Sequence, residues 1–207
     1  MGFLSKVEAV EKKEYGLPED LVMIDCEMTG VNPDIHSLLQ VAALKLKLKD
    51  GQYTEEGEPF MFYLHSDETP QSEFHKSYLI RIFEECNKSQ KTPEDLKSEF
   101  HTWLGDLKGK VMPVGDCVPT DVNFLYTSKG GDRPDIGDDG PIEGTFHYEY
   151  FEMNPLKMLV EEITGAKLKV EGLDDGIHDA LVDCRNQLIE LNHCLSVVTD
   201  IVGRVAS

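Results

Sequence analysis

The fold is decided by the stretch Leu21-Val22-Met23-Ile24-Asp25-Cys26-Glu27-Met28-Thr29-Gly30. Its apolar, strand-forming residues are interrupted by Asp25 and Glu27, and side chains two apart on a strand point to the same face. Two adjacent carboxylates repel each other unless a cation lies between them, and such hard oxygen ligands suit Mg²⁺ or Mn²⁺. The stretch therefore predicts a central strand with a metal site at its end. An isolated pair of this kind is more often solvated, so other residues must support this interpretation.

The composition limits how this protein can hold nucleic acid. The chain has 207 residues, 40% of them hydrophobic, which is enough for one domain with a substantial core. With 39 acidic and 20 basic residues its net charge is -19, which excludes a basic surface for long nucleic acid. A polyanionic substrate would be held locally, by divalent cations or a few Lys and Arg side chains. This favours a short or single-stranded end.

The cysteines and the apolar segments bear on the compartment. Five cysteines without C-x-x-C spacing indicate neither a disulfide framework nor a zinc site, and they fit a reducing compartment. The first residues lack the apolar core of a signal peptide, and no segment approaches transmembrane length. We therefore expect a cytoplasmic protein with no membrane partner.

The first half of the chain predicts mainly strands. Alternation of apolar and basic residues in the second half of 38–48 indicates a strand with one wet face, Asp50-Gly51 is a hairpin signal, and 60–64 supplies a third strand. These segments predict an antiparallel meander. Helical spacing in 77–83 and 93–104 then predicts helices that cover one face of the sheet.

The second half predicts a parallel crossover. A short strand over 111–115 is followed by a helix over 120–125, which is the usual order in such a connection. We further expect a strand over 146–151, a helix over 155–164 and a long final helix. The final helix carries an apolar stripe that would pack on the sheet and extend into a dimer contact. The stripe consists of Ala180, Cys184, Leu188, Leu191, Leu195, Val198 and Val202.

Two segments are expected to lie outside the core. Residues 1–18 have mixed charge and little periodicity, which predicts a loose lead-in to a single domain over 19–207. Residues 128–144 are rich in Gly, Asp and Pro, and their acidic spacing does not match an EF-hand. We expect this segment to be a solvated acidic loop insertion.

A second polar cluster opens the final helix, in the stretch His178-Asp179-Ala180-Leu181-Val182-Asp183. Positions five apart on an ideal helix point about 140° apart, so His178 and Asp183 cannot share one face. We expect His178 on the preceding loop and Asp183 in the first turns of the helix. A third acid, Asp121, follows Val114-Gly115 at the start of the middle helix. Taken singly, His178 could be a capping residue and Asp121 an exposed acid.

Together the three motifs resemble, in order and spacing, the DEDDh group of 3′→5′ exonucleases, and within it oligoribonuclease. The segment Cys26 to Pro33 is similar to the first motif of that family, Gly115 to Leu125 to the second, and His178 to Asp183 to the third. The segment Leu156 to Leu159 resembles the helix before the third motif. The resemblance covers residues 20 to 195.

The resemblance implies a ribonuclease-H-like α/β fold, a mixed sheet of about five strands flanked by helices. It implies that two divalent cations, Mg²⁺ or Mn²⁺, are held about 3.5–4 Å apart by the four carboxylates. His178, uncharged near neutral pH, would be the general base for the attacking water. The products would be 5′-mononucleotides from the 3′ ends of short single-stranded RNA or DNA. The four carboxylates are those of Asp25, Glu27, Asp121 and Asp183.

The resemblance also implies substrate-binding positions and a homodimer. The peptide N–H groups of Met28 and Thr29 lie where the family holds the terminal nucleotide, and Val31 lies where an apolar wedge separates the last two bases. Core packing is an equal alternative for Met28 and Val31.

Three positions depart from the family pattern. Glu149 stands where the family has an Arg that caps the 5′ phosphate of a very short RNA, Tyr78 stands where it has Gly, and Asp116 where it has Asn. These changes leave the metal ligands intact but weaken strict dinucleotide specificity, so a longer single-stranded end becomes plausible.

Two other functions stay open. One is a single-stranded DNA exonuclease of the repair or proofreading type, against which the scarcity of basic residues argues. The other is a non-catalytic interaction module that uses the acidic loop and the final helix. Such a module would have no physical reason to keep mutually repelling carboxylates.

Overall fold

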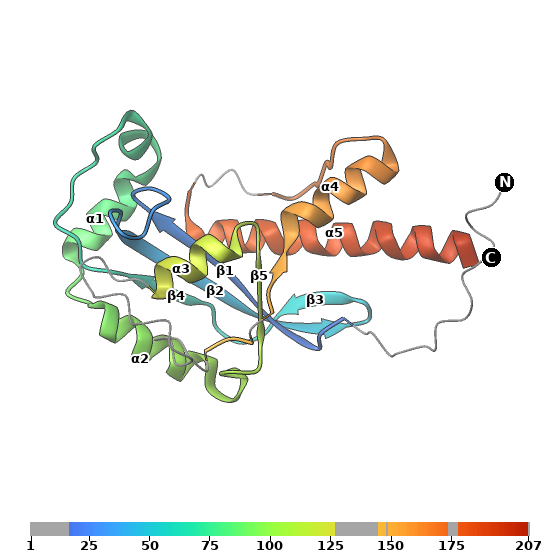
Figure 1. The fold of residues 1–207 in the computed structure, drawn as a ribbon, viewed down its shortest axis with the longest axis horizontal. Helices are drawn as coiled ribbons and strands as arrows, with labels where there is room; N and C mark the ends of the chain where they lie inside the picture. The colour runs from blue at the N-terminus through green and yellow to red at the C-terminus, as the bar shows by residue number, and fades with distance from the viewer. Residues whose placement is uncertain (1–16, 127–144, 148, 174–177, 207) are drawn as a thin grey trace.

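The computed structural model describes residues 17–126, 145–147, 149–173 and 178–206 (Figure 1). The lead-in expected over 1–18 lies almost entirely outside these residues, and the acidic loop expected over 128–144 lies entirely outside them. The strands are β1 (Asp20–Met28), β2 (Leu38–Lys49), β3 (Gln52–Glu55), β4 (Phe60–Tyr63), β5 (Met112–Gly115) and β6 (Phe151–Glu152). The α-helices are α1 (Ile80–Lys88), α2 (Pro93–Leu104), α3 (Val118–Tyr126), α4 (Met153–Thr164) and α5 (Ala180–Ala206).

The described strands form one mixed sheet in the order β3-β2-β1-β5-β6, with β4 also paired to β2. The central strand β1 is antiparallel to β2 and parallel to β5, and β5 is parallel to β6. The prediction of a ribonuclease-H-like α/β fold with a mixed sheet is confirmed, with six strands in place of about five.

The expected antiparallel meander is confirmed, since β1 and β4 both pair antiparallel with β2, but the short strand β3 was not predicted. Asp50 and Gly51 both have positive φ, 51° and 82°, and form the tight turn between β2 and β3 as expected. Strand β4 then pairs with the same strand, β2. This is possible because β2 has twelve residues, so β3 pairs with its second half and β4 with its first half.

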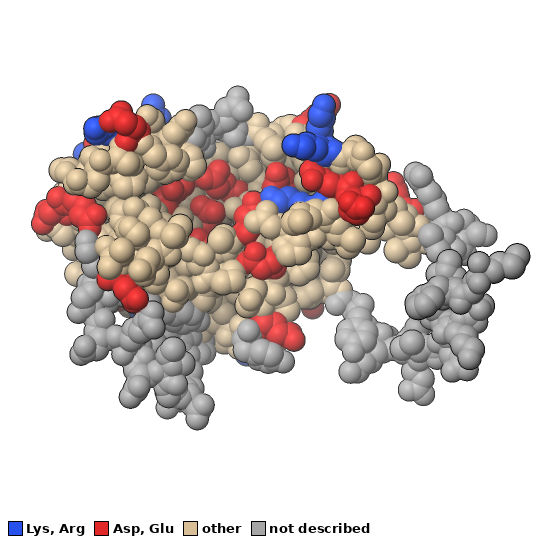
Figure 2. Space-filling view, turned by 45° about the horizontal axis from the view of Figure 1, so that its top comes forward, with Lys and Arg blue, Asp and Glu red and all other residues tan. Residues whose placement is uncertain are grey.

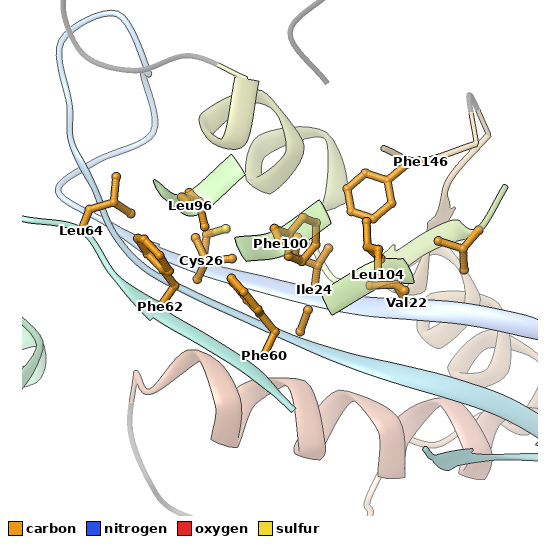
Figure 3. Packing of buried hydrophobic residues seen from close by; sticks show 13 residues of the cluster. Val22, Ile24, Cys26, Phe60, Phe62, Leu64, Leu96, Phe100, Leu104 and Phe146 are labelled. Atoms are coloured by element: carbon orange, nitrogen blue, oxygen red, sulfur yellow. The ribbon is translucent and has the colours of Figure 1, made fainter. Parts of the chain in front are cut away.

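The two faces of β1 are covered by different helices. Val22, Ile24 and Cys26 belong to a core cluster that includes the apolar side chains of α2, as Figure 3 shows. Leu21 and Met23 alternate with them and pack in a second cluster with residues of α5. The period of two therefore directs Asp25 and Glu27 to the face that α5 covers.

The long helix α5 packs along the sheet with its N-terminal half (Figure 1). Ala180, Cys184 and Leu191 are buried on the predicted stripe, whereas Val202 is 61% exposed because the helix extends beyond the second cluster. Asp179 caps the N-terminus of the helix. Its Oδ1 accepts hydrogen bonds from the backbone N–H groups of Leu181 and Val182.

Several other elements differ from expectation. The strand expected over 146–151 is reduced to Phe151–Glu152, and Phe146 instead fills the core beside Phe100, with 5.7 Å between ring centroids. The helix expected over 77–83 is a π-helix over His75–Leu79 that continues into α1. Among the helices in the described part of the chain, none is both long and apolar enough to span a membrane.

Candidate active site

Three predicted site residues converge at the end of β1. Glu27, from β1, is 8% exposed, and Asp183 lies in the first turn of α5. One ligand atom from each of Glu27, His178 and Asp183 lies within 4.8 Å of the other two. Helix α5 brings His178 and Asp183 close to Glu27, because it packs against the face of β1 that carries the acids.

His178 lies outside the helix, as its spacing from Asp183 predicted. It precedes α5 and has a φ of +54°, a left-handed conformation that costs energy for a residue with a side chain. Its Nδ1 lies 4.0 Å from Oε1 of Glu27. The bend at His178 therefore turns the imidazole over the carboxylate while Asp183 approaches from the helix.

Asp25 and Asp121 join this group through electrostatic coupling. Burial raises the pKa of Asp121 to about 9, with the charge of Asp25 as the next cause. Asp121 is 4% exposed in α3, and its backbone carbonyl lies 4.0 Å from Sγ of Cys26. The structure thus brings all five predicted residues to one end of the central strand.

The strand carboxylates are held in a protein environment that disfavours their charge. Burial and then the charge of the neighbouring Asp183 raise the pKa of Asp25 to about 7. Burial and then Asp25 raise the pKa of Glu27 to about 8, and burial also raises the pKa of Asp183. Clustered hard oxygen donors of this kind fit divalent cations, whose charge offsets both burial and repulsion. Figure 2 shows acidic side chains gathered in a hollow on this face of the molecule.

The negative charge of Asp116 is offset by an ion pair that the sequence did not indicate. Its Oδ2 accepts a hydrogen bond of 2.7 Å from Nζ of Lys157 in α4, which also binds Oε2 of Glu190 in α5 at 2.9 Å. Lys157 is largely buried between the two acids. The departure at Asp116 is therefore accompanied by a local ion pair, although Asp116 still raises the pKa of Asp25.

The last residue of β1 and the loop that follows it supply the three predicted substrate-binding residues. Val31 is 81% exposed, which rules out core packing for it, whereas Met28 packs against the first core cluster. The N–H of Thr29 donates to the carbonyl of Ser37 at 2.9 Å, and its Oγ1 accepts from the N–H of Ser37. The Thr29 N–H is thus already used to close the loop. The ring of His36 also packs on this loop, so close to Gly30 that a Cβ there would lie 2.5 Å from its Nε2.

Two aromatic side chains that sequence reasoning did not place at the site flank His178. The ring of Phe74 lies 4.9 Å from the imidazole and the ring of Tyr78 lies 5.0 Å from it, measured between centroids. Both contacts are edge-to-face, and Phe74 and Tyr78 also contact each other. Tyr78 is one of the departures from the family pattern, but no local signal in the sequence shows that the π-helix turns it toward a residue one hundred positions later.

A buried polar residue of α5, which the sequence did not single out, supports Asp25. Gln187 is 5% exposed, and its Nε2 donates a hydrogen bond of 3.0 Å to Oδ1 of Asp25. Gln187 follows Asp183 by four positions, so one face of α5 supplies both side chains. The sequence contained this helical spacing, but nothing in it distinguished Gln187 from an ordinary polar residue.

Comparison with known proteins identifies the family. The model of the RNase T family, described as an exonuclease, matches residues 22–128, which is more than half of the chain. The chain belongs to this exonuclease family. The match begins in the central strand and includes Asp25, Glu27 and Asp121. The predicted enzyme class, a 3′→5′ exonuclease, is confirmed.

Named relatives of this exonuclease cover most of its length. It is 28% identical to the oligoribonuclease of Vibrio vulnificus over 181 residues, which is 84% of this chain and 92% of the relative. It is 28% identical to the probable oligoribonuclease of Schizosaccharomyces pombe over 205 residues, or 92% of this chain and 74% of the relative. The predicted resemblance to oligoribonuclease is confirmed by these matches.

Solved structures show the same fold. The exonuclease is similar to E. coli exonuclease I in complex with a dT13 oligonucleotide, with a TM-score of 0.58 and 14% sequence identity. The match covers 90% of this chain but only 43% of exonuclease I, so the chain spans less than half the length of that enzyme. An exonuclease I from Methylocaldum szegediense matches with a TM-score of 0.57. At these identities the likeness concerns the fold.

Proposed function

We propose that this exonuclease hydrolyses short single-stranded nucleic acids, oligoribonucleotides above all, from the 3′ end to 5′-mononucleotides. The observation that carries the proposal is the convergence of Glu27, His178 and Asp183 within 4.8 Å at the end of β1, beside Asp25 and Asp121. The relatives named oligoribonuclease support the substrate class, since they match over most of their length. The net charge of -19 supports a short substrate.

The carboxylates would hold two divalent cations, Mg²⁺ or Mn²⁺. The proposed ligands are Asp25, Glu27, Asp121 and Asp183, whose burial and mutual repulsion raise their pKa values. When bound, such cations stabilise the attacking and the leaving oxygen of an in-line displacement at phosphorus. A structure of E. coli exonuclease I with single-stranded DNA in a zinc-bound form supports a metal site on this fold.

His178 would act as the general base. Its Nδ1 faces Glu27 at 4.0 Å, which leaves Nε2 to accept a proton from the attacking water. The imidazole is 37% exposed, so water can reach it, and Phe74 and Tyr78 restrict the orientation of the ring.

The loop after β1 would hold the 3′ end. Val31 projects from this loop and would separate the last two bases, while Met28 would offer its peptide N–H to the terminal nucleotide. Thr29 would contribute mainly by closing the loop, because both its N–H and its Oγ1 bind Ser37. The packing of His36 against Gly30 restricts the same loop.

We also propose a homodimer that works in the cytoplasm. Helix α4 presents exposed apolar side chains at Met158, Leu159 and Ile163, which are 69%, 52% and 51% exposed. Burial of this surface against a second copy would remove it from water. All five cysteines lie in the described residues and are free, as a reducing compartment requires.

Substrate length should be less restricted than in the resembled family. Glu149 carries a negative charge where an Arg would cap a 5′ phosphate, and its Oε2 lies 3.7 Å from Nδ1 of His147. We therefore expect comparable rates on two-residue and seven-residue RNA. A steep preference for the dinucleotide would contradict this part of the proposal.

One assay tests the proposed function. The purified protein is incubated with 5′-labelled RNA and matched DNA oligomers of two to seven residues, with Mg²⁺, Mn²⁺ or a chelator. We expect stepwise shortening from the 3′ end of RNA in either metal and none with chelator, and no shortening by Asp25→Ala. Equal activity of Asp25→Ala would refute the site, and a preference for DNA would favour the repair or proofreading alternative.

A further inference from the structure

Gln187 places a buried side-chain amide against the carboxylate of Asp25. The Gln187 side chain is 5% exposed, and its Nε2 lies 3.0 Å from Oδ1 of Asp25. Its Oε1 is also buried and has no hydrogen-bond partner among the described residues. An apolar side chain of the same size would fill this space without a buried unpaired oxygen. The contact with Asp25 is therefore the feature that explains an amide here.

The surrounding backbone leaves little room for any other arrangement. A Cβ on Gly115, at the end of β5, would lie 3.3 Å from Oε1 of Gln187 and 2.8 Å from the carbonyl oxygen of Ile24. The absence of a side chain at Gly115 thus lets the amide approach the β1–β5 pair. The amide is held between α5 and the sheet, so its direction toward Asp25 is fixed by packing.

An amide suits a carboxylate that must also bind a cation. It occupies one side of Oδ1 with a neutral donor, which fixes the direction of the Asp25 carboxylate and leaves Oδ2 for another partner. A Lys or Arg in the same place would form an ion pair with Asp25 and compete with the cation for it. Hydrogen bonds to metal ligands from outside the coordination sphere commonly orient those ligands and tune metal affinity.

We propose that Gln187 is a positioning residue that holds Asp25 in the orientation in which it binds a divalent cation. This inference rests on the proposed function, because it requires that Asp25 is a metal ligand. Asp183 and Gln187 are one turn apart on α5, so this helix would supply both a ligand and the support of another ligand.

Mn²⁺ binding to the full chain, measured by electron paramagnetic resonance of the free ion, tests the proposal without reference to turnover. Gln187→Met keeps the length of the side chain and removes the hydrogen bond, and Gln187→Asn keeps the amide but shortens its reach by one methylene. We expect both variants to fold, as judged by circular dichroism and thermal denaturation. We expect each to bind Mn²⁺ about 10–100-fold more weakly than the wild type.

Asn192→Met is the matched control on the same helix. Oδ1 of Asn192 accepts a hydrogen bond of 2.7 Å from the N–H of Tyr53 in β3, and its Nδ2 donates one of 2.8 Å to the Tyr53 carbonyl. The control therefore also loses amide contacts between α5 and the sheet, but at β3 and not at the acids. We expect a lower melting temperature and unchanged Mn²⁺ affinity.

The outcomes separate this inference from the proposed function. Wild-type Mn²⁺ affinity in both Gln187 variants, or equal weakening in Asn192→Met, would overturn the positioning role. Failure of both Gln187 variants to fold would assign Gln187 to stability and overturn it as well. If the wild type binds no Mn²⁺, or Asp183→Asn binds it as tightly as the wild type, the metal site of the proposed function itself is wrong.

Discussion

The two faces of β1 serve opposite purposes. On one face, Val22 and Ile24 are fully buried among apolar side chains of α2 and its neighbours (Figure 3). On the other face, the strand begins with apolar Met23 and ends with Asp25 and Glu27, whose charges are disfavoured by burial and by each other. One strand thus combines a stabilising face with a face whose acids oppose folding until a cation binds.

The comparison predicts the largest effect at the acids. Asp25→Asn should lower nucleotide release by on the order of 10³-fold or more, since the amide replaces a charged ligand with a neutral one. It should leave the melting temperature unchanged or higher, because one repelling carboxylate is removed. Steady-state rates in Mg²⁺ and thermal denaturation of the same sample measure both effects. A large loss of stability would show that Asp25 mainly serves the fold.

A substitution on the apolar face of β1 should lower stability and leave the rate of nucleotide release nearly unchanged. Ile24→Ala leaves a cavity beside the side chains of α2, and we expect the free energy of unfolding to fall by about 2–5 kcal/mol. The rate per folded molecule should stay within a few-fold of the wild type. Urea denaturation and active-site titration check these two expectations. A rate loss as large as that of Asp25→Asn would show that the two faces do not have separate roles.

The pH dependence of stability should reveal the acidic face without substrate. Burial raises the pKa values of Asp25, Glu27 and Asp121 to about 7, 8 and 9, so the metal-free folded state holds protons that the unfolded state has lost. The stability from these groups is therefore present at acid pH and decreases as pH rises from about 4 to about 9. Melting temperatures with chelator should fall over this range, and Mg²⁺ should raise them most near pH 9.

A matched variant tests whether the acids of the site cause the fall in melting temperature with rising pH. In Asp121→Asn the metal-free decrease should be smaller between pH 7 and 9, because the group whose pKa is about 9 is gone. If the slope were the same in this variant, general repulsion within an acidic protein would explain it.

The smallest effect is expected at the two aromatic rings that flank His178. Tyr78→Gly removes one edge-to-face contact with His178, worth about 0.5–1.5 kcal/mol. We expect kcat to fall by about 2–10-fold, with little change in Mg²⁺ affinity, because the imidazole loses one of its two flanking rings. Phe74→Leu offers a comparison at the second ring. Wild-type kcat in both variants would mean that the rings do not orient His178.

The sequence predicted those features whose causes are local. Helix α2 has the predicted bounds because Thr92 and Asp95 form a capping box and Pro93 occupies the first turn. The placement of His178 outside α5 followed from the helical repeat alone.

The features that the sequence did not predict depend on distant contacts. The contact of Gln187 with Asp25 and the ion pair of Lys157 with Asp116 join segments that are far apart in the chain. Each of these residues is ordinary in its local context. Their roles become visible only when α4 and α5 pack beside the sheet.

The most direct measurement is anomalous X-ray diffraction from crystals of the protein grown with Mn²⁺. The account predicts anomalous peaks at coordination distance from the carboxylates of Asp25, Glu27 and Asp183, at the end of β1. No peak there under conditions in which Mn²⁺ supports nucleotide release, or peaks only elsewhere on the surface, would contradict it.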